Sequence, residues 1–510
     1  MGTHVHTIDL IVMLVCLTGL ISIAVYFARR NRGTEDYFVG GRSFAGWAVG
    51  LSMLGTIVSS NTFLALPAAA YALDWRQLSV NFALPLVAIV ALLVFIPLFR
   101  YGLRTTAFEY LGQRFGAVPR FYGTLIFLVT ELIRAMQVLF LLSLPIEALT
   151  GAPGFLVIVG CGLVVAFYTV IGGLEGVIWI EVLLTAIMLL GAVVCLGSVA
   201  WALPGGFLQI FEVGAQHDKF SLGSFAWDLE ERTFWTVFLL GIVNWLGIYG
   251  GDQNIVQRYL AARSTWEARK ATIIYTSIAL PMWATFFMVG TGVYVFYQTF
   301  PSSEVAALDA DRVLPHFILT QVPPGIAGLI ITAIVAAAMS TLDASINAIS
   351  TVCVVDLGKV FLFQNRSDRF YLWLARCCAT LAAVLMISGA MALSVTPKES
   401  INDFSLTVAS IMSGCLMGLF MIGFFAPRVD GFAATLAIVA VIPLNVYLAL
   451  SSLGKLPEEY SIGLHKYWVG PLVNVAFMIV AFGIGLTRPA SAASKGLTIW
   501  TMNSQQEGVT

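Results

Sequence analysis

One apolar segment in the second half of the chain carries side chains suited to binding a small cation. Ala337, Ser340 and Thr341 stand at positions i, i+3 and i+4, so they share one face of a helix. The alanine carbonyl and the two hydroxyl groups offer oxygen ligands to a hard cation. The competing interpretation is structural, because serine and threonine hydroxyls in membrane helices often bond back to the i−4 carbonyl.

Ionisable side chains inside other apolar segments need a partner or a function. Glu131 and Arg134 stand at i and i+3 and can pair on one helix face. An arginine keeps its charge and presents a flat fork that binds a carboxylate through two hydrogen bonds. Arg134 is therefore a candidate for binding an anionic solute, and a purely structural pair is the alternative. Glu181 and Asp343 are two further intramembrane acids, and each costs about 2.5–3.5 kcal/mol on insertion scales.

The composition defines the setting of these groups. Of the 510 residues, 59% are apolar and 11% are charged, whereas a soluble domain has about 25% charged residues. The mean hydropathy is +0.89. These values exclude a soluble enzyme, a disordered chain and a disulfide scaffold. The net charge is −1, so no basic field attracts nucleic acid. The composition therefore predicts an all-α polytopic membrane protein.

Thirteen segments are apolar enough to cross a bilayer, which takes about 20 mostly apolar residues in a helix. They are 8–28, 44–72, 78–100, 120–149, 153–171, 176–202, 233–260, 270–297, 322–350, 370–394, 402–425, 430–451 and 466–486. No basic region precedes the first segment and no small-residue cleavage site follows it, so we interpret it as a span and not as a signal peptide.

The distribution of basic residues predicts the orientation. With residue 1 outside, eighteen of the 27 Lys and Arg residues fall in cytoplasmic segments, seven in external segments and two inside spans. This excess follows the positive-inside rule and fits an odd number of spans. We expect the N-terminus outside and the C-terminus in the cytoplasm, with a disordered polar tail from Ser491.

Two of the predicted spans contain small and polar residues where hydrocarbon is expected. The second has two serines, two threonines and an asparagine between Gly50 and Pro67, and the seventh has glycines, an acid and amides between Gly241 and Asn254. Backbone that leaves the helix at this depth must be buried in protein or line a wet cavity. A pair of such spans indicates the site of a secondary transporter, although small-residue packing faces are the alternative.

The positions of the two breaks predict the domain organisation. They open consecutive blocks of five spans, which predicts a five-plus-five inverted repeat with two discontinuous helices. The expected units are an N-terminal span with a cytoplasmic loop, a first half, a second half, a last span and the tail. Their bounds are 1–43, 44–202, 233–451, 452–490 and 491–510.

Five stretches, in matching order and spacing, resemble the sodium/solute symporter family. They are 36–42, 59–63, 172–179, 252–260 and 336–347. Within that family the chain is most similar to bacterial sialic-acid symporters, in 46–75 and in the arginine of the fourth span. The resemblance implies a leucine-transporter-type fold and Na⁺ as the coupling ion.

The resemblance also implies roles for individual residues. The main sodium site would use the backbone carbonyls of Gly55, Val58 and Ala337 and the hydroxyls of Ser340 and Thr341. The substrate contacts would be Ser59, Ser60, Thr62, Asn81 and Arg134. At a second sodium site of sialic-acid symporters this chain has Glu181, Asp343 and Ala344. Two facing carboxylates in low dielectric do not easily both ionise, so we expect Glu181 and Asp343 to hold a second cation or to share a proton.

Together these features predict a sodium-coupled symporter in a bacterial inner membrane. Its solute would be a small organic carboxylate, such as sialic acid or another sugar acid, imported by alternating access. The expected partners are the solute, Na⁺ and lipid, without nucleic acid, and the chain is expected to be a monomer. A symporter for a neutral sugar or polyol and a transporter-like membrane sensor are the alternatives. An enzyme is not expected, since the sequence has no phosphate loop, HExxH motif or nucleophile elbow.

Overall fold

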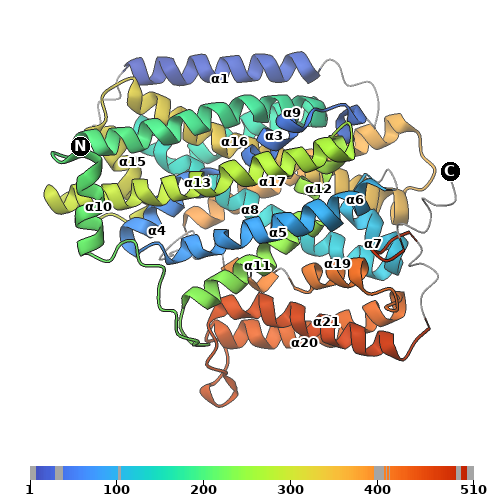
Figure 1. The fold of residues 1–510 in the computed structure, drawn as a ribbon. Coiled ribbons are helices and arrows are strands. Elements are labelled where there is room, and N and C mark those ends of the chain that lie inside the picture. Colours follow the sequence, from blue (N-terminus) through green and yellow to red (C-terminus); the bar gives the residue numbers. More distant parts are fainter. Residues whose placement is uncertain are drawn as a thin grey trace.

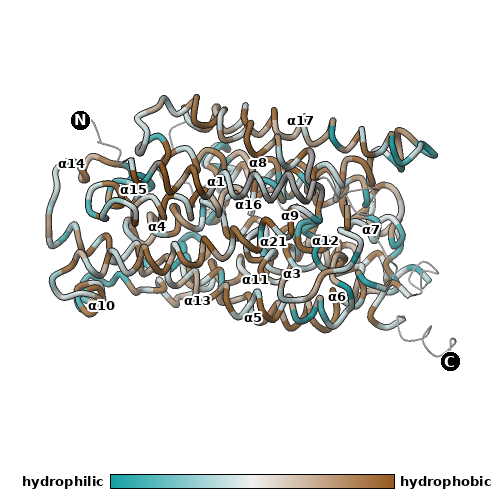
Figure 2. Tube along the Cα trace, turned by 90° about the horizontal axis from the view of Figure 1, so that it is seen from above, coloured by the Kyte–Doolittle hydropathy of each residue, from teal (hydrophilic) through white to brown (hydrophobic). Residues whose placement is uncertain are grey.

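The computed structural model describes residues 7–28, 38–101, 105–395, 407–408, 410–412, 414–489 and 496–501. The regular elements in this part of the chain are all helical, and extended pairing is limited to an isolated bridge between Phe44 and Ala262. The long helices lie side by side in one bundle, with α1 (Thr7–Ala28) along one edge and α20 (Gly431–Ser452) and α21 (Val469–Leu486) at the opposite edge (Figure 1). Apolar residues run along the helices, and hydrophilic residues gather toward the two ends of the bundle (Figure 2). This distribution is that of a membrane-spanning protein.

Most predicted spans coincide with helices to within a few residues. Among the described residues, nine helices are long and apolar enough to cross a membrane, or ten if one bent pair is counted as a single span. The remaining helices, in chain order, are η1 (Gly40–Arg42), α3 (Gly46–Ile57), η2 (Asn61–Ala65), α4 (Leu66–Ala72), η3 (Arg76–Ala83), α5 (Leu84–Val90), η4 (Ala91–Phe95), α6 (Ile96–Arg100), α7 (Ala107–Phe115), α8 (Ala117–Thr150), α9 (Gly154–Ala202), α10 (Gly206–Gln216), α11 (Phe234–Gly251), α12 (Gln253–Ala261), α13 (Thr265–Thr299), α14 (Ser303–Ala306), α15 (Ala310–Gln321), α16 (Ile326–Val352), η5 (Cys353–Leu362), α17 (Asp368–Ser394), α19 (Leu416–Phe425), η6 (Glu458–Tyr460) and η7 (Lys466–Trp468).

Three predicted spans differ from the structure or extend outside its described part. The spans 153–171 and 176–202 lie in one helical element, α9, which has 49 residues where about 20 cross a bilayer. Its apolar stretches on either side of residues 171–173 are Gly154–Val170 and Leu174–Ala202, so no loop separates the two predicted spans. Much of the predicted span 402–425 lies outside the described residues, and its end is the helix α19.

The second predicted span is broken, as the sequence indicated. The helix α3 ends at Ile57, Val58 has extended backbone angles, and the chain bends by 62° before the helical segment that begins at Asn61. At the break, the backbone amide of Asn61 donates to the hydroxyl of Ser59, 3.2 Å away. Short polar side chains thus replace part of the lost helical hydrogen bonding, which explains why they occur at this point.

The two helices that flank the candidate ion site are both capped by acids from other helices. The Asp9 carboxylate in α1 accepts hydrogen bonds from the amides of Gly325 and Gly328, at 2.6 and 2.8 Å, at the start of α16. Glu267 at the start of α13 accepts one from Gly46, the first residue of α3. Carboxylates favour helix N-termini because the free amides and the helix dipole attract negative charge there. The sequence did not show these contacts, since the partners are more than 200 residues apart.

The two ends of the bundle are tied by basic side chains. At one end, the Lys219 ammonium donates to the carbonyls of Tyr71 and Leu73 at the end of α4, at 2.7 and 2.8 Å, and lies 3.8 Å from the ring centre of Tyr294. Burial lowers the pKa of Lys219 to about 8. At the other end, the buried Arg114 in α7 donates to the carbonyl of Ala426 at 2.7 Å.

Part of the polar tail is docked against that second end. The Tyr110 hydroxyl donates to the carbonyl of Leu497 at 2.9 Å, and the Trp500 indole donates to the carbonyl of Phe425 at 2.8 Å. The amide of Ile499 donates to the carbonyl of Phe424 at 3.1 Å. The prediction of a disordered tail is therefore wrong for residues 496–501, because hydrogen bonds hold this segment and the side chains of Leu497 and Ile499 pack against the core.

Removing the Asp9 carboxylate should weaken the fold. We expect Asp9→Ala to lower the free energy of unfolding by about 0.5–2 kcal/mol, the usual cost of losing an N-terminal cap. Asp9→Asn keeps an acceptor oxygen and should lose less. The measurement is thermal unfolding of the purified protein in detergent, with Ser22→Ala on the exposed part of α1 as control. Equal melting of Asp9→Ala and the unaltered chain would contradict the capping role.

Candidate ion and substrate site

The break in the second span and the middle of α16 face each other and bring together all five predicted sodium ligands. The Ser340 hydroxyl lies 2.8 Å from the carbonyl oxygen of Gly55 and 3.0 Å from that of Ala337. The Thr341 hydroxyl lies 3.3 Å from the carbonyl oxygens of both Val58 and Ala337. A further carbonyl, that of Thr56, lies 3.2 Å from the same hydroxyl and was not predicted.

This set of oxygens fits a small monovalent cation. The donors are three predicted carbonyls and two hydroxyls, neutral oxygen ligands without a carboxylate among them, and both hydroxyl groups are almost fully buried. Gly55 allows α3 to pack closely against α9, because a Cβ atom at this position would overlap the hydroxyl of Thr185. Na⁺, a transported ion and not a resident cofactor, would be held by Gly55, Val58, Ala337, Ser340 and Thr341.

A cavity of about 330 Å³ lies on the other side of the same break. Four of the five predicted substrate residues line it: Ser59, Thr62, Asn81 and Arg134. Ser60 does not. Its side chain is fully buried and donates to the carbonyl of Val138 in α8 at 2.8 Å. The prediction of a substrate contact at Ser60 is corrected by the structure, because the bend turns neighbouring residues to opposite sides.

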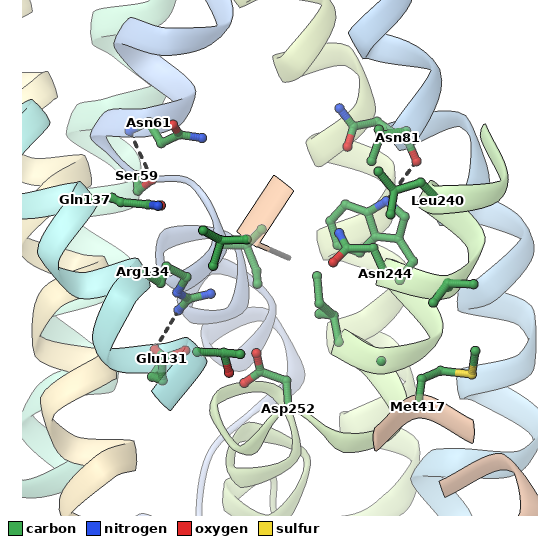
Figure 3. A pocket seen from close by; sticks show the side chains of 18 of the residues that line it. Ser59, Asn61, Asn81, Glu131, Arg134, Gln137, Leu240, Asn244, Asp252 and Met417 are labelled. Carbon is green, nitrogen blue, oxygen red and sulfur yellow. Dashed lines mark hydrogen bonds and ion pairs between the residues drawn. The ribbon is translucent and has the colours of Figure 1, made fainter. Parts of the chain in front are cut away.

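The cavity also contains residues that the sequence interpretation did not assign to it. Among these are four amides and two indoles: Asn61, Gln77, Gln137, Asn244, Trp245 and Trp283. Figure 3 shows Asn61, Ser59 and Gln137 on one side of the cavity and Asn81 and Asn244 on the other. The indole of Trp245 donates to the carbonyl of Val80 at 3.1 Å and so joins α11 to the segment that carries Asn81. Polar residues within apolar spans were the available signal for these positions.

The predicted Glu131–Arg134 pair is present, with 3.0 Å between Arg134 Nη2 and Glu131 Oε1. The arginine side chain is 29% exposed and points into the cavity (Figure 3). Glu131 has two further hydrogen-bond partners. Its Oε1 accepts from the side-chain amide nitrogen of Asn254, at 3.0 Å, and from the hydroxyl of Ser345. The acid therefore connects the cavity with α12 and with α16.

The seventh predicted span is also interrupted. Its first part, α11, ends at Gly251, Asp252 has extended backbone angles, and α12 begins at Gln253. The Asp252 side chain caps α12 by accepting from the amide of Asn254 at 2.7 Å. It also lines the cavity, near Glu131 and Arg134 (Figure 3). The sequence predicted this break, but it did not predict that Asp252 lies beside Arg134.

The two remaining intramembrane acids have different surroundings. Glu181 is fully buried, forms an ion pair with Arg258 of α12, and accepts hydrogen bonds from Ser52 and, at 2.8 Å, Thr56. Asp343 is also fully buried, and Tyr168 donates to its Oδ2 at a long 3.4 Å. Its Oδ1 has no hydrogen-bond partner among the described residues. The sequence interpretation did not identify Arg258 as the partner of Glu181. The break at Asp252 determines how α12 is placed relative to α9, and that placement was not available from the sequence.

Comparison with known proteins agrees with this geometry. The sequence model of the sodium:solute symporter family matches residues 37–440. The sodium/sialic acid symporter SiaT of Proteus mirabilis is 29% identical, over 95% of each chain. The human sodium/iodide cotransporter is 30% identical over 88% of this chain and 70% of its own length. A solved substrate-bound, outward-open structure of a Na⁺-coupled sialic acid symporter is 28% identical, with a TM-score of 0.86 over 95% of this chain and 98% of that one.

The helices long enough to cross a membrane and the match to this family identify a membrane transporter and not an enzyme. The chain belongs to the sodium:solute symporter family, whose members couple solute transport to Na⁺.

The two hydroxyls of the ion site provide a direct test. We expect Ser340→Ala and Thr341→Ala each to raise the sodium concentration for half-maximal transport, because each removes one oxygen ligand. At fixed sodium the apparent substrate affinity should fall too, since coupling between two ligands is reciprocal. Sodium titrations of uptake into proteoliposomes measure both effects.

A matched control for this test lies on the same helix. Thr332→Ala removes a buried hydroxyl that bonds only to the carbonyl of Gly328, at 2.7 Å, two turns from the site. It should leave the sodium dependence unchanged. Unaltered sodium curves in both Ser340→Ala and Thr341→Ala would show that the ion binds elsewhere.

Proposed function

We propose that this symporter imports a small organic carboxylate, such as sialic acid or another sugar acid, by sodium-driven alternating access. One observation carries the proposal: a partly exposed arginine, Arg134, points into a cavity that shares the break at Ser59 with the candidate ion site. A guanidinium binds carboxylates bidentately. The two relatives named above transport anions, as their names state.

The shared break supports a physical route for coupling. The carbonyl of Val58 faces the ion site, and the next residue, Ser59, lines the cavity. A cation that fixes the carbonyl positions also fixes the backbone of the cavity wall, so a solute finds a more ordered site. A second connection runs through Glu131, which contacts both Arg134 and Ser345 on the ion-binding helix. Each ligand would then shift the protein toward the state that the other prefers.

A neutral sugar or polyol is the second candidate solute. The amides of Asn61, Gln77, Asn81, Gln137 and Asn244 line the cavity and suit hydroxyl groups. Arg134 distinguishes the two candidates, since a neutral solute gains little from a guanidinium that Glu131 already balances.

We also propose a more detailed architecture. The chain would form thirteen spans with a five-plus-five inverted repeat, function as a monomer, and lie in a bacterial inner membrane with its N-terminus outside. The two interrupted spans, at Val58 and Asp252, support this arrangement.

Of the two buried acids, we propose that Asp343 takes the second cation or the proton. Glu181 already has a cationic partner in Arg258, whereas Asp343 has one long hydrogen bond and a carboxylate oxygen without a partner. A buried carboxylate without compensation is costly, and binding a cation or proton relieves that cost.

Arg134 decides the class of solute. Arg134→Lys keeps the charge but loses the fork, so we expect carboxylate uptake at limiting concentration to fall by about 10- to 100-fold, as hydrogen bonds to charged groups contribute about 1.5–3 kcal/mol. Sodium-dependent stabilisation against heat should survive. Arg76→Lys, in a surface ion pair with Asp74, is the matched control. Equal uptake of a neutral solute by the unaltered protein and by Arg134→Gln would contradict the anionic solute.

The two acids should respond differently to neutralisation. Asp343→Asn should change the pH dependence of uptake or the number of sodium ions per cycle without large loss of stability. Glu181→Gln leaves Arg258 buried without its partner, so it should destabilise the protein by about 3–5 kcal/mol. Thermal unfolding and sodium stoichiometry in proteoliposomes measure these effects. Asp343→Asn with unchanged pH and sodium curves would exclude Asp343 as a coupling site.

A further inference from the structure

The charges around the cavity do not match a purely anionic solute. Among the described residues that line it, the ionisable ones are Glu131, Arg134 and Asp252, two acids and one base. Glu131 already neutralises Arg134 through the 3.0 Å ion pair. Asp252 is thus an additional negative charge, close enough to interact electrostatically with both. A lone carboxylate entering here would bring one more negative charge into a site of low dielectric.

The local structure around Asp252 is also suited to a cation. Its Oδ1 is occupied by the amide of Asn254 and by the side-chain nitrogen of the same residue, at 2.7 and 3.0 Å, and the carboxylate still faces the cavity. The 18-residue helix α11 ends directly before it, and the C-terminal end of a helix carries partial negative charge. Two indoles, Trp245 and Trp283, line the same cavity with ring centres 5.3 Å apart. Indole faces attract ammonium groups.

Arg134 and Asp252 lie at the same end of the cavity, from α8 and from the break between α11 and α12 (Figure 3). Opposite charges at one end suit a solute whose own opposite charges are close together. The carboxylate would bind the part of the guanidinium that is open to the cavity, since the Arg134 side chain is 29% exposed beside its ion pair with Glu131. An ammonium group would face Asp252. The amides on the cavity walls remain for the polar rest of the molecule.

We propose that the transported carboxylate also bears a protonated amine close to its carboxyl group, as in an amino acid or an amino sugar acid. This inference rests on the proposed function and narrows its substrate class. Each charge of such a solute has an opposite charge in the site, and the total charge of the cavity does not change on binding. Acids without an amine, and acids whose amine is acylated, leave Asp252 facing the cavity without a cation.

Matched pairs of probes test the proposal on the unaltered protein. Thermal unfolding in detergent and competition for uptake into sealed proteoliposomes are measured with and without Na⁺. The pairs are alanine and propionate, proline and cyclopentanecarboxylate, phenylalanine and 3-phenylpropionate, and glucosaminate and gluconate, with N-acetylneuraminate and glucose added singly. We expect at least one amine-bearing acid to bind in a sodium-dependent manner, and its partner without the amine to bind at least about tenfold more weakly.

The acid itself is then tested by substitution. Asp252→Asn keeps an oxygen for the amide of Asn254, so α12 retains its cap, but the charge is lost. It should remove the preference for the amine within each pair. Asp430→Asn is the matched control, because Asp430 also caps a helix, by accepting from Ala433 at 2.9 Å, and does not line the cavity. It should leave the preference intact.

The outcomes separate this inference from the proposed function. Propionate, gluconate or N-acetylneuraminate could bind in a sodium-dependent manner as tightly as the amine-bearing probes. That result would overturn the requirement for an amine and leave the proposal of a carboxylate symporter standing. An amine preference that persists in Asp252→Asn overturns the role of Asp252. A response to glucose alone overturns both proposals. If no amine-bearing probe stabilises the protein or competes for uptake, the inference is overturned, whatever the other probes do.

Discussion

A helix that stops in the middle of a membrane leaves carbonyl groups without partners, and the rest of this structure is arranged around that constraint. At Val58 the second span opens, and the carbonyls of Gly55, Thr56 and Val58 are met by two hydroxyls of α16. The same bend directs Ser59 and Thr62 into the cavity. The candidate ion site and the candidate solute site are therefore two faces of a single break in one helix, and the proposed coupling between them needs no long pathway.

The sequence was sufficient to predict these local features for a physical reason. Glycine, serine and asparagine inside an apolar run are costly in lipid unless the backbone is buried or lines water. Their presence in two apolar segments therefore indicated the break at residues 58–60 and the one before α12. The spacing of Ala337, Ser340 and Thr341 determines a shared helix face without knowledge of the fold. The Glu131–Arg134 pair followed from helical periodicity in the same way.

What the sequence could not show depends on how distant segments pack. The contacts of Arg258 with Glu181, and of Asp9 with the start of α16, join residues 77 and more than 300 positions apart. Ser60 was expected in the cavity from the family resemblance, and only the geometry of the bend turns it toward Val138. Residues 496–501 belong to a tail that is polar overall, yet Leu497 and Ile499 pack against the core and carbonyls at the end of α19 accept hydrogen bonds from the segment.

The ion pair of Glu181 and Arg258 has a mechanical consequence. It joins α9 to α12, and through Ser52, which both side chains contact, it also joins them to α3. Both charges are almost completely buried, and separating them would leave each uncompensated, at a cost of several kcal/mol. No hinge can therefore lie between these three helices. The three helices would therefore move together, and Val58–Ser59 and Asp252, where the chain leaves the helix within a span, are the points next to them at which the backbone can bend.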